Sequence, residues 1–281
     1  MQTMKGLVAV ITGGTRGIGR ATAERFASEG ADLALCARTP EALEQTAGEL
    51  MRKHGVKVFT SAASILDRAG MDGFIDAAAT ALGRIDILVN NAGASEQRAA
   101  GGSRQQVYAV DPVSRALPPG RFASMEDEEF LNAFNQKVLA LIYTMRAVLP
   151  WMRKTGGGAI VNVVSMKGKQ PPPRVVSSSV AAAAAMNLSK SLSPELAGEN
   201  IRVNVVALES ILTSQTEKSR ERWAPGKTME EFLAPRNANI PMHRLGTPEE
   251  VAHAIYCLTA PLGAYITGQV LSVDGGGLRS W

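Results

Sequence analysis

A glycine-rich segment close to the N-terminus has the residue types that could hold a phosphate group. It reads Thr12-Gly13-Gly14-Thr15-Arg16-Gly17-Ile18-Gly19 and joins a short apolar run to a stretch with helical spacing. Small residues permit a tight turn and a close approach of the backbone to a pyrophosphate. The N-terminus of the next helix then offers free N–H groups and the positive end of its dipole. The segment predicts a nucleotide-binding turn; the alternative is a turn that binds nothing.

The end of the second apolar run bears on which nucleotide would bind. An acidic residue there usually bonds the ribose 2′-hydroxyl of NAD. This chain has Ala37 and Arg38 instead, and Arg16 lies in the glycine-rich segment. Two guanidinium groups can form bidentate hydrogen bonds with a 2′-phosphate. NADP(H) is therefore favoured over NAD(H); the alternative is two solvated arginines.

Short apolar runs alternate with segments of helical spacing and would form the framework that positions these residues. Each run is continuous in Val, Ile, Leu and Ala, which is typical of strands covered on both faces. The runs are Gly6–Ile11, Asp32–Cys36, Lys57–Ser61, Ile85–Val89, Ala159–Val164, Arg202–Val206 and Gln269–Val273. The helical segments include Gly19–Glu29, Pro40–His54, Ala69–Leu82 and Pro248–Thr259. This order predicts an α/β fold with one doubly wound parallel sheet, helices on both faces and a single domain over residues 1–281.

Two segments interrupt this order, at about residues 95–123 and 209–242. The first is rich in Gly, Pro, Ser and Arg, and the second has mixed charges and weak periodicity. Loops of this length are uncommon in compact domains. Both follow the carboxyl ends of expected strands, where ligands bind in open α/β sheets. We therefore expect two lids over a substrate; the alternative is a pair of inert insertions.

The composition excludes several classes of protein. Of 281 residues, 45% are hydrophobic and 20% are charged, as in an average globular domain. The net charge of +4 is spread along the chain, whereas a nucleic-acid-binding protein would concentrate it. Cys36 and Cys257 are expected to be buried, reduced thiols, and three scattered histidines argue against a zinc site. With no signal peptide and no long apolar run, a cytoplasmic location is expected and a membrane span is not.

Several motifs together resemble those of the short-chain dehydrogenase/reductase family. They are Thr12–Gly19, Asn90-Asn91-Ala92-Gly93, Ile160–Ser165, Ile201–Val206, Arg244–Val251, Tyr265–Val270 and Val273-Asp274-Gly275-Gly276. The resemblance covers nearly the whole chain except the two expected lids. It implies a Rossmann-type sheet of about seven strands, a nicotinamide cofactor, and a homodimer or homotetramer formed through two long central helices.

The resemblance also assigns residues to the cofactor. It implies that the phosphates are held by Gly13, Thr15, Arg16, Gly17 and Ile18. It implies that the adenosine ribose and the nicotinamide lie beside Asn91, Ala92 and Gly93, with Thr213 near the carboxamide and the phosphates. Ser64 and Ile65 are the candidates for the adenine side, where the family usually has an Asp that binds the adenine amino group.

The catalytic positions depart from the family pattern. The family uses Ser, Tyr and Lys, often with an Asn, and the Lys lowers the pKa of the Tyr so that it exchanges protons near neutral pH. Ser165 matches the Ser, but the Tyr position falls on Ser178 and the Lys position on Ala182. None of the four tyrosines is followed four residues later by Lys. Tyr108, in the first expected lid, is the candidate for a substitute acid.

Lys137 stands where the resemblance places the family Asn. Helical spacing from Glu126 onward is expected to bury Phe134, Val138, Leu141, Met145 and Val148, and Lys137 lies on the edge of that apolar face. A lysine there must reach solvent, form a pair or work at a site. We interpret it as binding the cofactor ribose or the substrate oxygen; the alternative is a lysine that reaches solvent or an interface. Glu209, after the sixth expected strand, could pair with Lys137, lie near the nicotinamide or face solvent.

The function expected from these observations is an NADP(H)-dependent oxidoreductase acting on a carbonyl/alcohol pair. Ser165 and Ser178 would bind the substrate oxygen, Lys137 would supply the proton or electrostatic stabilisation, and no metal is expected. Lys167, Lys169 and the arginines of the first lid favour a small anionic substrate. Alternatives on the same scaffold are a nonredox lyase, isomerase or cyclase, and a catalytically silent nucleotide-binding subunit.

Overall fold

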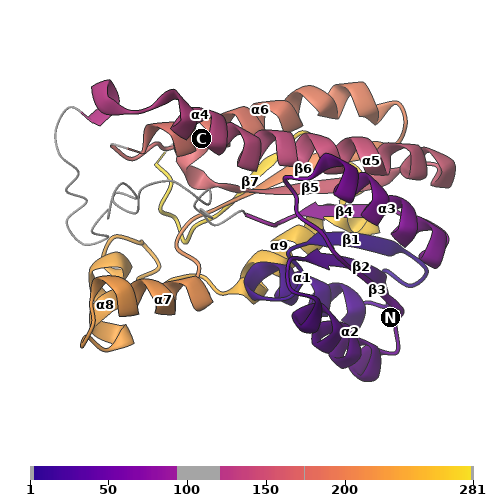
Figure 1. Ribbon diagram of the computed structural model, residues 1–281, viewed down its shortest axis with the longest axis horizontal. Helices are drawn as coiled ribbons and strands as arrows, with labels where there is room; N and C mark the ends of the chain where they lie inside the picture. The colour runs from indigo at the N-terminus through magenta and orange to yellow at the C-terminus, as the bar shows by residue number, and fades with distance from the viewer. Residues whose placement is uncertain (1–2, 94–120, 174, 280–281) are drawn as a thin grey trace.

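A seven-stranded sheet forms the centre of the protein (Figure 1). The computed structural model describes residues 3–93, 121–173 and 175–279. The strand order is β3-β2-β1-β4-β5-β6-β7, and every neighbouring pair is parallel. The strands are β1 Val8–Thr12, β2 Asp32–Ala37, β3 Val58–Ala62, β4 Ile87–Asn90, β5 Gly158–Ser165, β6 Ile201–Leu208 and β7 Val270–Val273. Every expected strand is present, with small shifts at its ends.

Helices cover both faces of the sheet, as Figure 1 shows. One face carries α3 (Arg68–Leu82), α5 (Ala140–Thr155) and α6 (Val176–Ala197), and the other carries α1 (Gly17–Ser28), α2 (Pro40–His54) and α9 (Pro248–Thr259). Each layer has its own apolar core, with Phe74 and Val148 in the first and Phe26 and Leu50 in the second. Burial of each such side chain stabilises the fold by about 1.5–3 kcal/mol. The expected doubly wound α/β fold is confirmed.

The sequence signals at the start of α9 are borne out in atomic detail. The hydroxyl of Thr247 accepts the N–H of Glu250 at 3.3 Å, and the Glu250 carboxylate accepts the N–H of Thr247 at 2.8 Å. Pro248 follows at the first helical position, where its missing N–H costs nothing. The expected bounds of α9 and of α2 agree with those observed.

Strands β1, β2 and β3 follow one another toward one edge of the sheet, and the chain then returns to place β4 on the other side of β1. Helix α1, which follows β1, and helix α5, which follows β4 in the chain, cover opposite faces of the sheet, and in such an arrangement ligands bind at the carboxyl ends of the strands. The glycine-rich segment follows β1, and Asn91 follows β4. The fold therefore brings the two expected cofactor-binding segments to the same place.

The long helix that carries Lys137 contains a π turn. Helix α4 (Asp127–Phe134) continues through the π-helical turn η2 (Asn135–Leu139) into α5. Val138, Leu141, Met145 and Val148 are buried as expected, but Phe134 is 42% exposed. The prediction for Phe134 is wrong because the wider π turn rotates α4 relative to α5, so one apolar face does not run through both.

Two helices lie in the segment that was expected to be a second loop-like lid. Helices α7 (Ser214–Trp223) and α8 (Met229–Asn237) stand apart from the layered body, on the side where the strands end (Figure 1). The expectation of a long loop is wrong there, because a capping box of Thr228 and Glu231 starts α8 and Phe232 anchors it at 2% exposure.

The remaining described elements are short 3₁₀ turns: η1 Arg121–Ser124, η3 Met166–Gly168 and η4 Pro261–Gly263. The other expected lid falls mostly on residues 94–120, which lie outside the described residues, as does Tyr108. None of the described helices is long and apolar enough to cross a membrane.

Candidate active site

The glycine-rich segment has the backbone conformation that glycine permits and other residues resist. Gly13 and Gly17 have φ angles of 70° and 52°, in the left-handed region. Helix α1 begins directly after Arg16, whose side chain makes no cap hydrogen bond, and its first turn has no acidic residue. The first N–H groups of α1 therefore remain available to an anion, and the dipole of the helix favours one. This local geometry fits a phosphate group.

The glycine-rich segment is bound to the loop after β4. The Thr12 hydroxyl accepts the backbone N–H groups of Asn91 and Ala92, each at 3.0 Å, and the Asn91 side chain donates to the Thr12 carbonyl at 3.1 Å. A Cβ atom on Gly19 would lie 2.1 Å from the carbonyl oxygen of Gly13, so only glycine fits there. Sequence reasoning gave Thr12 no separate role, yet this hydroxyl holds together the two segments that are expected to bind the cofactor.

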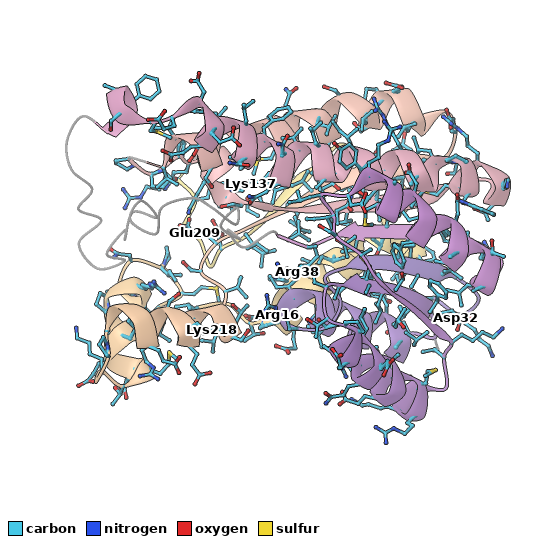
Figure 2. All side chains as sticks on the ribbon, in the orientation of Figure 1. Arg16, Asp32, Arg38, Lys137, Glu209 and Lys218 are labelled. Carbon is cyan, nitrogen blue, oxygen red and sulfur yellow. The ribbon has the colours of Figure 1, made fainter. Side chains whose placement is uncertain are left out.

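Two arginines stand beside this cradle. The carbonyl of Cys36 accepts the N–H of Gly13 at 2.8 Å, which places the end of β2 and the following Arg38 next to the glycine-rich segment. Arg16 and Arg38 are both exposed, and within the described residues neither forms an ion pair. Figure 2 shows both on the side of the sheet that faces α7. They can therefore meet an anionic group without giving up a carboxylate partner.

The thiols differ in their surroundings. Cys36 is buried beneath the glycine-rich segment, and burial raises the pKa of its thiol to about 12, so it is a neutral packing group. Cys257 is exposed on α9, and the expectation that both thiols are buried is therefore wrong for Cys257. Its position faces outward because α9 packs its Val251 and Ile255 face against the sheet.

Thr213 lies over the glycine-rich segment. It is the N-cap residue of α7, and its methyl carbon would be 3.6 Å from a Cβ atom on Gly17. The start of α7 therefore lies close to the start of α1. Ser64 lies farther along, after β3, where its exposed hydroxyl accepts the N–H of Leu66 at 3.3 Å; Ile65 packs partly against the core.

Lys137 and Ser178 are brought into contact. Lys137 lies in the π turn η2, and Ser178 lies in the first turn of α6, which packs against η2 and α4. The ammonium group of Lys137 donates to the Ser178 hydroxyl in a very short hydrogen bond and lies 3.5 Å from the Ser178 carbonyl oxygen. The lysine therefore turns toward α6 and does not extend along the helix surface. Single π turns occur often at functional sites because they redirect one side chain.

Ala182, where the resemblance places the family Lys, is closely packed. Ala182 is 0% exposed, and a Cβ atom on Gly168 of η3 would lie 3.1 Å from its carbonyl oxygen. Ser165 ends β5, and its hydroxyl accepts the N–H of Lys167 at 3.3 Å. Within the described residues Ser165 makes no hydrogen bond to Lys137 or Ser178. Of the three expected catalytic residues, Lys137 and Ser178 are hydrogen-bonded to each other, and in the part of the chain that the structure describes Ser165 is not bonded to either.

Glu209 does not join this pair. It is exposed at the end of β6, and in the part of the chain that the structure describes it makes no ion pair with Lys137. The next residue, Ser210, has a φ angle of 57°, which costs energy for a residue with a Cβ atom. The chain therefore turns sharply here. Figure 2 labels Glu209 and Lys137, which both lie on the side where the strands end.

A chain of buried polar side chains ties the helices of Lys137 and Ser178 to the sheet. Thr144 on α5 donates to the side chain of Asn90 on β4 at 2.7 Å, and Asn90 donates to Asn162 on β5 at 2.9 Å. Asn162 in turn donates to Ser189 on α6 at 2.9 Å. All four are at most 4% exposed. Sequence reasoning missed this network, although an Asn inside an apolar strand, as at position 162, was a visible signal.

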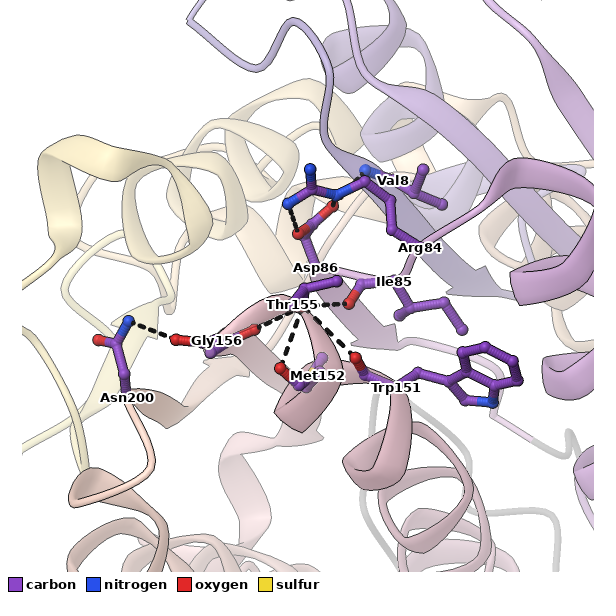
Figure 3. Close-up of polar contacts among 10 residues, drawn as sticks. Val8, Arg84, Ile85, Asp86, Trp151, Met152, Thr155, Gly156 and Asn200 are labelled. Atoms are coloured by element: carbon purple, nitrogen blue, oxygen red, sulfur yellow. Dashed lines mark hydrogen bonds and ion pairs between the residues drawn. The ribbon is translucent and has the colours of Figure 1, made fainter.

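The opposite edge of the sheet holds a hollow of about 270 Å³, where the strands begin. Figure 3 shows that its polar groups bond to one another. Asn200 donates to the Gly156 carbonyl at 3.0 Å, Thr155 donates to the Met152 carbonyl at 3.0 Å, and Arg84 pairs with Asp86. These contacts stabilise the turns at the ends of the neighbouring helices and strands. In the described residues no group of three His, Cys, Asp or Glu could hold a metal ion.

Comparison with known proteins finds relatives along the whole chain. A family model described as enoyl-(acyl carrier protein) reductase matches residues 13–277. A 3α-hydroxysteroid dehydrogenase of Mediterraneibacter gnavus is 31% identical over 273 residues, which cover 97% of each chain.

Two solved structures are similar in fold and in sequence. L-Sorbose reductase from Gluconobacter frateurii, complexed with NADPH and L-sorbose, has a TM-score of 0.86 and 32% identity, and the match covers 100% of both chains. An NADPH-bound short-chain oxidoreductase from Pseudomonas aeruginosa PAO1, which contains an atypical catalytic center, has a TM-score of 0.81 and 34% identity, with 98% of both chains covered. The two matches therefore extend over the glycine-rich segment and over the region of Lys137 and Ser178.

Proposed function

The chain belongs to the short-chain dehydrogenase/reductase family and is an NAD(P)-dependent oxidoreductase of that type, and from this premise we propose that it uses NADP(H) to interconvert a carbonyl compound and an alcohol. The catalytic groups in this proposal are Lys137, Ser178 and Ser165. The residues at the family Tyr and Lys positions, Ser178 and Ala182, make this an atypical active site.

The preference for NADP(H) is supported by the charges beside the glycine-rich segment. Arg16 and Arg38 would bind the 2′-phosphate, and the first N–H groups of α1 would bind the pyrophosphate. Asn91, Ala92, Gly93 and Thr213 would border the ribose and the nicotinamide, with Ser64 and Ile65 on the adenine side. When bound, the nicotinamide supplies or takes up a hydride at the substrate carbon. Two structural neighbours contain NADPH, which agrees with this choice.

The observation that carries the proposal is the contact between Lys137 and Ser178. In reduction, the substrate oxygen gains negative charge and needs a proton. Lys137 would hold that proton and pass it through the Ser178 hydroxyl to the oxygen, while Ser165 would orient the oxygen by a second hydrogen bond. The cation thus comes from the π turn, and α6 supplies only the hydroxyl.

The experiment measures NADPH oxidation at 340 nm with a panel of aldehydes and ketones, including anionic ones. Lys137→Ala is expected to lower kcat by about 10²–10⁴-fold, the usual contribution of a general acid. Lys190→Ala is the matched control, because Lys190 is an exposed lysine farther along α6. Unchanged turnover in Lys137→Ala would contradict the role of this lysine.

A thermal-shift titration with NADPH and NADH separates binding from turnover. Stabilisation by NADPH without oxidation of any substrate would contradict the redox proposal and favour a nonredox enzyme or a silent subunit. The absence of any shift would contradict the cofactor assignment. We further propose a cytoplasmic homodimer or homotetramer and a small anionic substrate, which Lys167 and Lys169 beside Ser165 would attract.

A further inference from the structure

We propose that Ser178 is also a covalent nucleophile, which Lys137 activates, and that the protein hydrolyses small carboxylic esters without any nucleotide. This inference goes beyond the redox proposal, because it uses the same two residues but no hydride. Its basis is the contact of a serine hydroxyl with a lysine amine, which is one of the known arrangements for activating a serine.

The contact has the geometry that proton transfer requires. The Lys137 nitrogen and the Ser178 oxygen are already within hydrogen-bond reach. The π turn around Lys137 and the start of α6 hold both residues on packed helices, since η2 contacts both α4 and α6. A base and a nucleophile that are already in contact need little rearrangement before reaction.

The start of α6 can stabilise the negative charge that forms during attack. Ser178 is the third residue of α6, whose N-cap residue Val175 makes no side-chain cap hydrogen bond. The first N–H groups of a helix have no acceptor within that helix. That of Ser178 would therefore serve as a donor for an oxyanion next to the Ser178 hydroxyl, aided by the helix dipole.

Neighbouring serines differ from Ser178 in ways that make it the expected nucleophile. Ser179 is 5% exposed, and its hydroxyl donates to the Val175 carbonyl at 2.6 Å. Ser177 is half-buried, as Ser178 is, but has no hydrogen bond to a lysine in the described residues. The Ser165 hydroxyl accepts a backbone N–H and does not contact Lys137. Ser177 is therefore the matched control.

The reaction balances with water as the second reactant. Neutral Lys137 takes the proton of Ser178 while the Ser178 oxygen bonds to the ester carbonyl carbon. The bond from this carbon to the alkoxy oxygen breaks, and the alcohol leaves with the proton from Lys137. Water then attacks the acyl-serine, Lys137 takes one proton of this water, and the carboxylic acid is released as Ser178 regains its hydrogen.

The experiment uses the purified full chain with p-nitrophenyl acetate and no nucleotide, followed at 405 nm. A fluorophosphonate probe, with peptide mapping by mass spectrometry, identifies the labelled residue. We expect label on Ser178 and a loss of both label and hydrolysis of at least about 100-fold in Ser178→Ala and Lys137→Ala. Ser177→Ala is expected to match the parent protein. Lys137→Arg is also expected to lose activity, because a guanidinium does not accept the proton.

One further variant distinguishes loss of the nucleophile from a folding defect. Ser178→Cys keeps a nucleophile next to Lys137, so iodoacetamide is expected to alkylate position 178 in that variant faster than Cys257. Label on another residue, or equal hydrolysis by Ser178→Ala, would overturn the proposal. NADPH oxidation that persists without ester hydrolysis would overturn this inference alone. Ester hydrolysis without NADPH oxidation would overturn only the redox proposal.

Discussion

Lys137 would donate a proton in carbonyl reduction and accept one from Ser178 in ester hydrolysis. The two proposed reactions should therefore differ in how their rates depend on pH. Carbonyl reduction needs the protonated amine, whereas ester hydrolysis needs the neutral amine. We expect kcat for reduction to fall and kcat for hydrolysis to rise as the pH of the buffer is raised. Parallel profiles of the two rates, measured in one buffer series, would contradict a shared lysine.

Arg38 is the residue at which we expect the proposed preference for NADP(H) to be reversible. Arg38→Glu places a carboxylate where NAD-binding sites usually have one, and removes a charge-assisted contact worth about 1.5–3 kcal/mol. The Kd for NADPH is expected to rise by about 10–100-fold, while that for NADH falls or stays unchanged. Fluorescence titration measures both constants. Arg52→Ala, on the exposed side of α2, is the control, and an equal loss of both cofactors in Arg38→Glu would contradict a 2′-phosphate contact.

Among the elements, the strands and most helices follow from the sequence because a single physical signal determines each. Buried parallel strands need continuous apolar runs, and α9 needs its cap, so both were predicted with small errors at the ends. The π turn has no such signal. Helical spacing assumes a constant turn, so Phe134 was assigned to the core although the turn rotates it outward. The contact of Lys137 with Ser178 follows from that turn and was therefore beyond the reach of spacing alone.

The buried polar chain is expected to fix α5 and α6 against the sheet. Thr144→Val keeps the shape of the side chain but leaves the Asn90 oxygen without its donor, which costs about 1–3 kcal/mol. Urea unfolding is expected to show this loss. Thr80→Val is the control. The Thr80 hydroxyl donates to the backbone carbonyl of Asp76 in its own helix, but Thr80 is exposed. Equal stability of the Thr144→Val and Thr80→Val variants would show that the chain does not hold these helices.

The contacts at the start of α9 are expected to stabilise the fold near neutral pH and to lose this effect in acid. Arg244 and the N–H of Thr247 lower the pKa of Glu250 from its usual 4.5 to about 2. A lowered carboxyl pKa stabilises the fold above the usual value, and this contribution is lost as pH falls toward 2. The difference in Tm between the parent protein and Glu250→Gln should therefore be greatest near neutral pH and shrink below about pH 4.5. Glu249→Gln is the control, and a Tm difference that is constant with pH would contradict the assignment.

At the scale of the whole molecule, the sheet determines where chemistry can occur. The two segments expected to bind the cofactor lie together because the strand ends of a doubly wound sheet bring them to one edge. Sequence spacing could not show that Thr213 lies against Gly17, since more than 190 residues separate them and the contact depends on where α7 stands. The proposed site is thus divided between the layered body, which would bind the nucleotide, and the long helices, which carry the proposed catalytic pair.

The proposed homodimer or homotetramer is expected to form through the outer surface of α4 and α6. Leu131 and Phe134 on α4 and Val180 on α6 are 57%, 42% and 55% exposed, and the two helices that carry them pack against each other. Exposed apolar side chains grouped in this way favour burial against a second copy. We expect light scattering to give a multiple of 29.7 kDa, and a combined Leu131→Glu and Val180→Glu variant to give a smaller multiple. Met51→Glu, at 42% exposure on α2, should leave the mass unchanged; a monomeric parent protein would contradict the proposed assembly.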